Sequence, residues 1–90
     1  MKKDIKKLTT SFKALANERR LLILKFLRKK GEASVSEIAR EIKLSIKSTS
    51  RHLSVLRAVD FVECEQRSLL VFYCVSRTLD REIKHLVTLF

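Results

Sequence analysis

The spacing of apolar residues predicts helices along most of the first half of the chain. In residues 4–16 an apolar stripe lies opposite lysines, which is the pattern of an amphipathic helix that packs against another element. The stripe consists of Ile5, Leu8, Phe12, Leu15 and Ala16. Asn17 is a good N-cap for residues 18–29, which are apolar on most sides and predict a central buried helix ending at Gly31.

A short helix, a tight turn and a second helix are predicted over residues 34–57. Ser34 and Glu37 have the spacing of a capping box, in which each side chain accepts a hydrogen bond from the other residue's backbone amide. Residues 43–44 form the turn, and Ser45 is expected to cap the second helix. This order of elements is that of a helix-turn-helix unit.

The second helix of this unit has an apolar side and a polar side without an acid. We expect the apolar side to contain Ile46, Thr49, Leu53 and Leu56. The polar side contains Lys47, Ser48, Arg51, His52 and Ser54. A helix about 10 to 12 Å across fits a B-DNA major groove about 12 Å wide, so we interpret it as a DNA recognition helix. The alternative is an ordinary surface helix with a solvated basic face.

After this helix the pattern changes. Residues 61–75 alternate and are rich in β-branched and aromatic types around a polar centre, which predicts a two-stranded hairpin, or wing. Ser76 is expected to cap a final helix over residues 77–90, whose apolar stripe has little remaining chain to cover it. We therefore predict that helices 4–16 and 77–90 form a dimer interface. Its predicted residues are Ile5, Leu8, Phe12, Leu79, Ile83, Leu86 and Phe90.

Composition favours a polyanionic partner. The 90 residues include 20 Lys and Arg against 10 Asp and Glu, a formal net charge of +10. This charge favours nucleic acid, with an anionic membrane surface as the competitor. No apolar run approaches the roughly 18 residues of a spanning helix, and the first residues lead into no signal-like segment, so we expect a cytoplasmic, nucleoid-associated protein.

Length and residue types narrow the class further. The absence of Pro and the single Gly predict a mainly helical chain. A length of 90 residues predicts one domain, over residues 1–90, with a modest core, so a second copy of the chain is expected to add stability. With two histidines, few acids and no Gly-rich loop, the chain offers no catalytic constellation, and we predict that it is not an enzyme.

Three segments within about residues 12–75 resemble the ArsR family of bacterial and archaeal winged-helix repressors. Residues 12–24 look like the family's opening, residues 48–57 are similar to its recognition-helix signature, and residues 61–63 followed by 71–73 look like its wing. The resemblance implies a winged helix-turn-helix with five helices and a two-stranded wing. It also implies operator binding by a homodimer whose first and last helices pack across a two-fold axis.

The family's sensing chemistry does not carry over. Where metal-responsive members place two cysteines, this chain has Ser34-Val35-Ser36, which lacks thiolate ligands. The last helix offers only Asp80, Glu82 and His85, which do not match the family's acid and histidine pattern. We therefore predict no metal and no cofactor, and the sequence shows no obvious small-molecule ligand. Residues 68–69 replace the usual glycine and basic residue of the wing, which weakens its expected grip on DNA.

Two cysteines suggest a possible redox pair. If the hairpin turns near Leu69, Cys64 and Cys74 lie directly opposite each other. One interpretation is a thiol switch that distorts the wing. The other is a pair of small buried hydrophobic residues in a reducing cytoplasm.

These features predict a sequence-specific regulator of transcription that binds double-stranded DNA, a homodimeric repressor of an inverted-repeat operator. Arg51 is expected to grip guanine through two bonds, and Lys43 and Arg67 to contact phosphates. The full set of predicted DNA contacts is Lys43, Ser45, Lys47, Ser48, Thr49, Arg51, His52 and Arg67. The alternative is a winged-helix module that coats nucleic acid without sequence preference or binds another protein.

Overall fold

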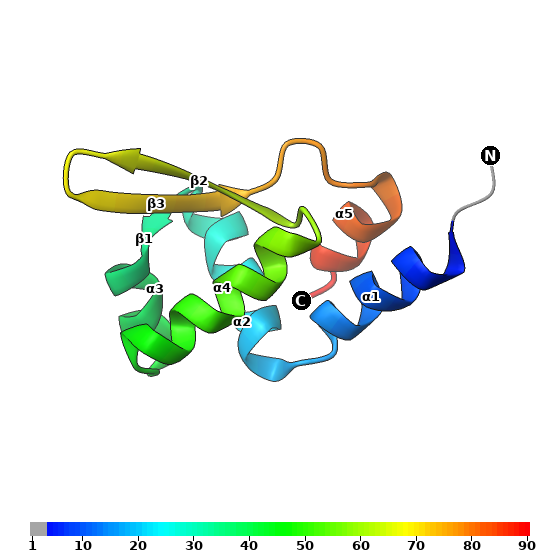
Figure 1. The fold of residues 1–90 in the computed structure, drawn as a ribbon, viewed down its shortest axis with the longest axis horizontal. Coiled ribbons are helices and arrows are strands. Elements are labelled where there is room, and N and C mark those ends of the chain that lie inside the picture. Colours follow the sequence, from blue (N-terminus) through cyan, green and yellow to red (C-terminus); the bar gives the residue numbers. More distant parts are fainter. Residues whose placement is uncertain (1–3) are drawn as a thin grey trace.

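The computed structural model describes residues 4–90, which form five helices and a small antiparallel sheet of three strands (Figure 1). The helices are α1 (Ile5–Leu15), α2 (Glu18–Lys30), α3 (Val35–Ile42), α4 (Ile46–Ala58) and α5 (Arg81–Val87). The strands are β1 (Ala33–Ser34), β2 (Val62–Arg67) and β3 (Leu70–Val75). The mainly helical prediction is confirmed, but the sheet has three strands instead of two. No helix among the described residues combines the length and apolarity needed to cross a bilayer.

The helix starts follow the capping signals of the sequence. The Asn17 side chain accepts from the backbone N–H of Arg20 at 3.1 Å, and Ser45 accepts from Ser48 at 3.1 Å. The capping box at the start of α3 has both of its bonds, at 3.0 and 3.2 Å. Gly31 ends α2 with a φ of 97°, a conformation that glycine adopts without strain. These local predictions are confirmed.

Helix α2 is the central buried helix, as predicted. Its Ile23, Leu24 and Leu27 are buried against residues from every other helix. The rest of the buried apolar core consists of Ala14, Ala33, Ile38, Ile42, Leu53, Leu56, Phe61, Val62, Ile83 and Val87. Ile83, predicted for the dimer interface, is only 5% exposed and belongs to the protomer's own core. That prediction is wrong because α5 folds back onto α2 and buries this residue.

The wing has a different register from the predicted one. The strands are joined by a two-residue turn at 68–69, so Cys64 pairs with Tyr73 and Cys74 pairs with Glu63. Adjacent positions on a strand point to opposite faces of a sheet, and the two cysteines therefore face away from each other. The predicted facing pair is wrong by one residue of register. Strand β1 adds to the other edge of β3 and ties the wing to the start of α3.

The last helix is shorter than predicted. It begins at Arg81 after Asp80, instead of after Ser76. Ser76 is buried, and its hydroxyl accepts from the backbone N–H of Thr78 at 3.2 Å and lies 3.1 Å from the Thr78 hydroxyl. The serine therefore stabilises the turn between β3 and α5 and does not cap a helix.

Candidate nucleic-acid interface

Helix α4 has one side in the core and the opposite side exposed. Thr49, Leu53 and Leu56 are fully buried. At about 100° per residue, Lys47 and Arg51 each lie about 160° round the helix from Thr49, so both face away from the core. Both are exposed. Ile46, expected on the apolar side, is 55% exposed because it lies in the first turn, beyond the edge of the core.

The exposed side of α4 is positively charged. Within residues 4–90, neither Lys47 nor Arg51 has a hydrogen bond or ion pair to another side chain. The first turn of α4 also leaves backbone N–H groups unpaired, as helix starts do, and these groups favour an anion. Ser45 and Lys43 are exposed beside this turn, and Ser48 is half-buried. The arrangement suits a phosphate backbone next to a groove.

Thr49 does not belong to this surface. Its side chain is fully buried, so the prediction that it contacts DNA is wrong. Its Oγ1 is also the one buried side-chain polar atom within residues 4–90 that has no hydrogen-bond partner. Spacings of four and then three residues place Thr49 on the same side of α4 as Leu53 and Leu56, as the helical period predicts.

Arg67 is held by the protein's own carboxylates. Its Nη1 and Nη2 donate to the two Glu32 oxygens at 2.7 Å each, and its Nε donates to Glu65 at 2.9 Å. The guanidinium carbon also lies 4.9 Å from the centre of the Phe72 ring. The bonds from Glu32 raise the pKa of Arg67, and the same bonds lower the pKa of Glu32. These bonds join the wing to the end of α2 and compete with the phosphate contact expected of Arg67, which stays a prediction.

Two arginines at the start of α2 also bond within the protein. Arg19 donates from Nη1 to the carbonyl of Ile42 at 2.9 Å, at the end of α3. Arg20 approaches Nδ1 of His52 through Nη1 at 3.3 Å. Burial first, and then the charges of Arg20 and Arg19, lower the pKa of His52, which keeps the half-buried ring neutral near pH 7. The sequence pattern gave no sign of these contacts.

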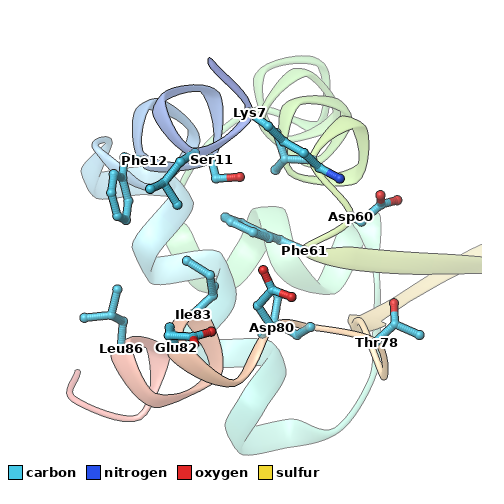
Figure 2. Close-up of a pocket in the computed structure, with 13 residues that line it drawn as sticks. Lys7, Ser11, Phe12, Asp60, Phe61, Thr78, Asp80, Glu82, Ile83 and Leu86 are labelled. Atoms are coloured by element: carbon cyan, nitrogen blue, oxygen red, sulfur yellow. The ribbon is translucent and has the colours of Figure 1, made fainter. Parts of the chain in front are cut away.

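An open groove lies between α1 and α5, on a different face from the basic side of α4. It has a volume of about 410 Å³. Figure 2 shows Phe12 of α1 and Leu86 of α5 on opposite sides of the groove, with Phe61 between the two helices. Phe12 is 49% exposed and Ile5, at the start of α1, is 73% exposed. Leu8, Leu79 and Phe90 are partly buried near the same groove or against the core.

The part of the chain that the structure describes holds no cluster of three or more His, Cys, Asp or Glu side chains able to bind a metal ion. Cys64 and Cys74 are both partly buried and unpaired. Burial raises the pKa of the Cys74 thiol, which makes it a weaker nucleophile at neutral pH.

Comparisons with known proteins agree with this arrangement. Residues 17–63 match the model of the bacterial regulatory protein, arsR family. The transcriptional activator HlyU of Vibrio cholerae is 38% identical over 89 residues, 99% of this chain and 79% of that protein. A helix-turn-helix transcriptional regulator of uncharacterised role from Methanocaldococcus jannaschii is 31% identical over 78 residues, 87% of this chain and 84% of that protein.

Solved structures show the same fold. The structure of HlyU from Vibrio cholerae has a TM-score of 0.82 at 37% identity and covers 99% of this chain and 92% of its own. A homodimeric winged helix-turn-helix DNA-binding domain from Mycobacterium bovis, a possible ArsR-family regulator, has a TM-score of 0.81 at 28% identity. The match covers 94% of this chain and 75% of the Mycobacterium bovis chain. The chain belongs to the ArsR family and is a transcriptional regulator with a winged helix-turn-helix DNA-binding fold. Its relatives are regulators and not enzymes.

Proposed function

We propose that this regulator binds an inverted-repeat operator as a homodimer, with one α4 in each of two successive major grooves. One observation carries the proposal. Lys47 and Arg51, on the exposed side of α4, have no partner within residues 4–90, whereas Arg19, Arg20 and Arg67 are bonded to the protein itself. The unpaired charges of α4 are therefore available to an external anion.

The roles of the α4 residues follow from their positions. Arg51 faces directly outward and suits a two-bond contact with guanine, while Lys47 and Ser48 lie one turn earlier, near base edges and neighbouring phosphates. Lys43 and Ser45 lie at the helix start, where backbone amides and a lysine contact phosphates. These phosphate contacts add affinity and salt dependence without much choice of sequence.

The dimer is proposed to form through α1 and α5. Phe12 and Leu86 are partly exposed at the open groove, and Ile5 is exposed at the start of α1. Such exposed apolar side chains are typical of a surface that a second copy covers. The Mycobacterium bovis relative with the same fold is described as homodimeric. Two copies related by a two-fold axis would present their α4 helices to two half-sites about one helical turn apart.

The direction of regulation stays a prediction. The sequence resemblance predicted a repressor, whereas the Vibrio cholerae relative is named an activator. Both outcomes are compatible with the same DNA-binding fold. A reporter gene with the operator placed over or upstream of the promoter distinguishes the two. The proposed function also places the protein in the cytoplasm, on the nucleoid.

The proposal is tested by two pairs of substitutions that remove the same charge. Lys47→Ala with Arg51→Ala changes the exposed side of α4, and Lys25→Ala with Lys29→Ala changes exposed lysines of α2. Affinity is measured by fluorescence anisotropy at about 0.15 M salt, for a duplex enriched from a random pool and for a random duplex.

We expect the α4 pair to abolish the preference for the enriched duplex, at about 1 to 3 kcal/mol for each lost base contact. The α2 pair should lower the affinity for the enriched duplex and for the random duplex by the same factor. Equal losses from both pairs would contradict the proposal and indicate a nonspecific nucleic-acid coat. A wild-type protein that binds neither duplex would favour a protein-binding module.

A further inference from the structure

The guanidinium of Arg20 joins the end of α1 to α4. Its Nε donates to the carbonyl of Ala14 at 2.6 Å and its Nη2 donates to the carbonyl of Lys13 at 3.2 Å. Its Nη1 lies 3.3 Å from Nδ1 of His52. Because two backbone carbonyls hold the guanidinium, its position does not depend on a flexible side-chain partner.

This contact decides which nitrogen of His52 carries the proton. A guanidinium has only N–H donors, so a hydrogen bond to it requires Nδ1 of the histidine to accept. The proton of the neutral ring is then on Nε2. Within residues 4–90, Nε2 of His52 has no hydrogen-bond partner, and the side chain is only half-buried. An N–H donor is therefore left for an acceptor outside the protein.

The position of His52 fits an acceptor at the edge of the DNA groove. At about 100° per residue, His52 lies about 60° round α4 from the buried Thr49. Ser48 lies one turn earlier on the same flank, between His52 and the helix start. Phosphates border the major groove along such a flank, whereas Arg51 faces the groove itself.

We propose that Arg20 is a positioning residue for DNA binding: it fixes the Nε2–H form of His52, which donates to an operator phosphate. Arg20 itself does not touch the DNA, since its three bonds lie between α1 and α4. The inference rests on the proposed function, and it gives a role to a contact that links α4 to the end of α1, a helix of the proposed dimer surface.

The charges around the ring keep this form dominant. Arg20 and Arg19 of α2 are the charged groups that act on the ring, and with burial they lower the pKa of His52. Lys13 of α1 contacts Arg20 only through its carbonyl, and Lys47 and Arg51 are further cations of α4 itself. Protonation would place an N–H on Nδ1 against the N–H of Arg20, so acid breaks the contact.

The first test needs no DNA. Long-range ¹H–¹⁵N spectra of the labelled wild-type protein report the tautomer of His52, and a pH titration reports its pKa. We expect the Nε2–H form in the wild type. Arg20→Met should give a mixture of both neutral forms and a higher pKa, whereas the matched Arg19→Met, which removes the same charge, should retain the Nε2–H form. A wild-type Nδ1–H form, or equal behaviour of the two variants, would overturn the inference.

The second test is a double-mutant cycle with His52→Gln, since the glutamine amide offers a donor near the Nε2 position without help from Arg20. The probe is the duplex enriched from a random pool. We expect Arg20→Met to weaken binding about two- to tenfold per half-site beyond Arg19→Met, the effect of one hydrogen bond. When His52→Gln is also present, Arg20→Met and Arg19→Met should weaken binding to the enriched duplex by the same factor.

If Arg20→Met still weakens binding more than Arg19→Met when His52→Gln is also present, the positioning role of Arg20 is overturned. Thermal unfolding and the mass in solution establish whether each variant folds. If the Arg20→Met protein does not fold, the tautomer of His52 in the wild-type protein still tests the inference. If the wild type shows the Nε2–H form but binds no duplex, the proposed function fails and this role fails with it. If it binds the enriched duplex in the Nδ1–H form, only the present inference fails.

Discussion

Thr49→Val is expected to stabilise the protein without changing its affinity for DNA. Thr49 is fully buried in the core side of α4, and its Oγ1 has no hydrogen-bond partner among the described residues. Valine has nearly the same shape and places a methyl group where the hydroxyl lies. Thr and Val have similar helix propensities, so the backbone contributes little to the difference.

The magnitude follows from the unpaired hydroxyl. A buried polar group without a partner costs about 1 to 3 kcal/mol, and its removal recovers part of that cost. We therefore expect the free energy of unfolding to rise by about 1 kcal/mol. In a domain of this size, that change raises the midpoint of thermal unfolding by about 4 to 8 °C.

The assay is thermal unfolding at one protein concentration, because dimer formation makes the midpoint depend on concentration. Thr49→Ser is the matched control. It keeps the hydroxyl, loses a buried methyl group and should lower the free energy of unfolding by about 1 kcal/mol. A less stable Thr49→Val protein would refute the assignment of an unpaired hydroxyl. A more stable protein with weakened DNA binding would refute the placement of Thr49 away from the DNA.

Three further predictions concern the wing and the dimer. Glu32→Gln removes the charge and one of the two oxygens that accept from Arg67, so it should weaken the hold on Arg67 and steepen the salt dependence of duplex binding by up to about 0.9 in the log–log slope; an unchanged slope would place Arg67 away from DNA. Oxidation should not link Cys64 to Cys74 within one chain, because they face opposite sides of the wing, and such a link in a mass spectrum of unreduced protein would contradict the register. Phe12→Glu should give a monomer by sedimentation, whereas an undiminished mass would exclude α1 from the interface.

Signals between near neighbours in the chain were predictable from the sequence. The caps at Asn17, Ser34 and Ser45 each use a side chain that bonds to an amide three residues later, and all of them were expected. The buried and exposed sides of α4 followed from helical spacing, except in its first turn, where the core no longer covers Ile46.

Contacts between distant residues were not predictable. Arg67 meets Glu32 across 35 residues of sequence, and Arg20 meets His52 across 32, so the spacing of charges says nothing about either pair. The wing register was missed because its turn lacks the Asn-Gly or Asp-Gly signature that fixes a two-residue loop. Ser68 instead adopts a φ of 59° in that turn, a conformation uncommon for serine.

The most direct test of the central claim, that two α4 helices recognise a specific duplex, is selection of DNA from a random pool at about 0.15 M salt. The mass of the protein and of its complex is measured in the same buffer. We predict an enriched inverted repeat, bound by a dimer, with half-sites about 10 base pairs apart. A pool without enrichment, bound with an affinity that falls alike for every duplex as salt rises, would contradict the account.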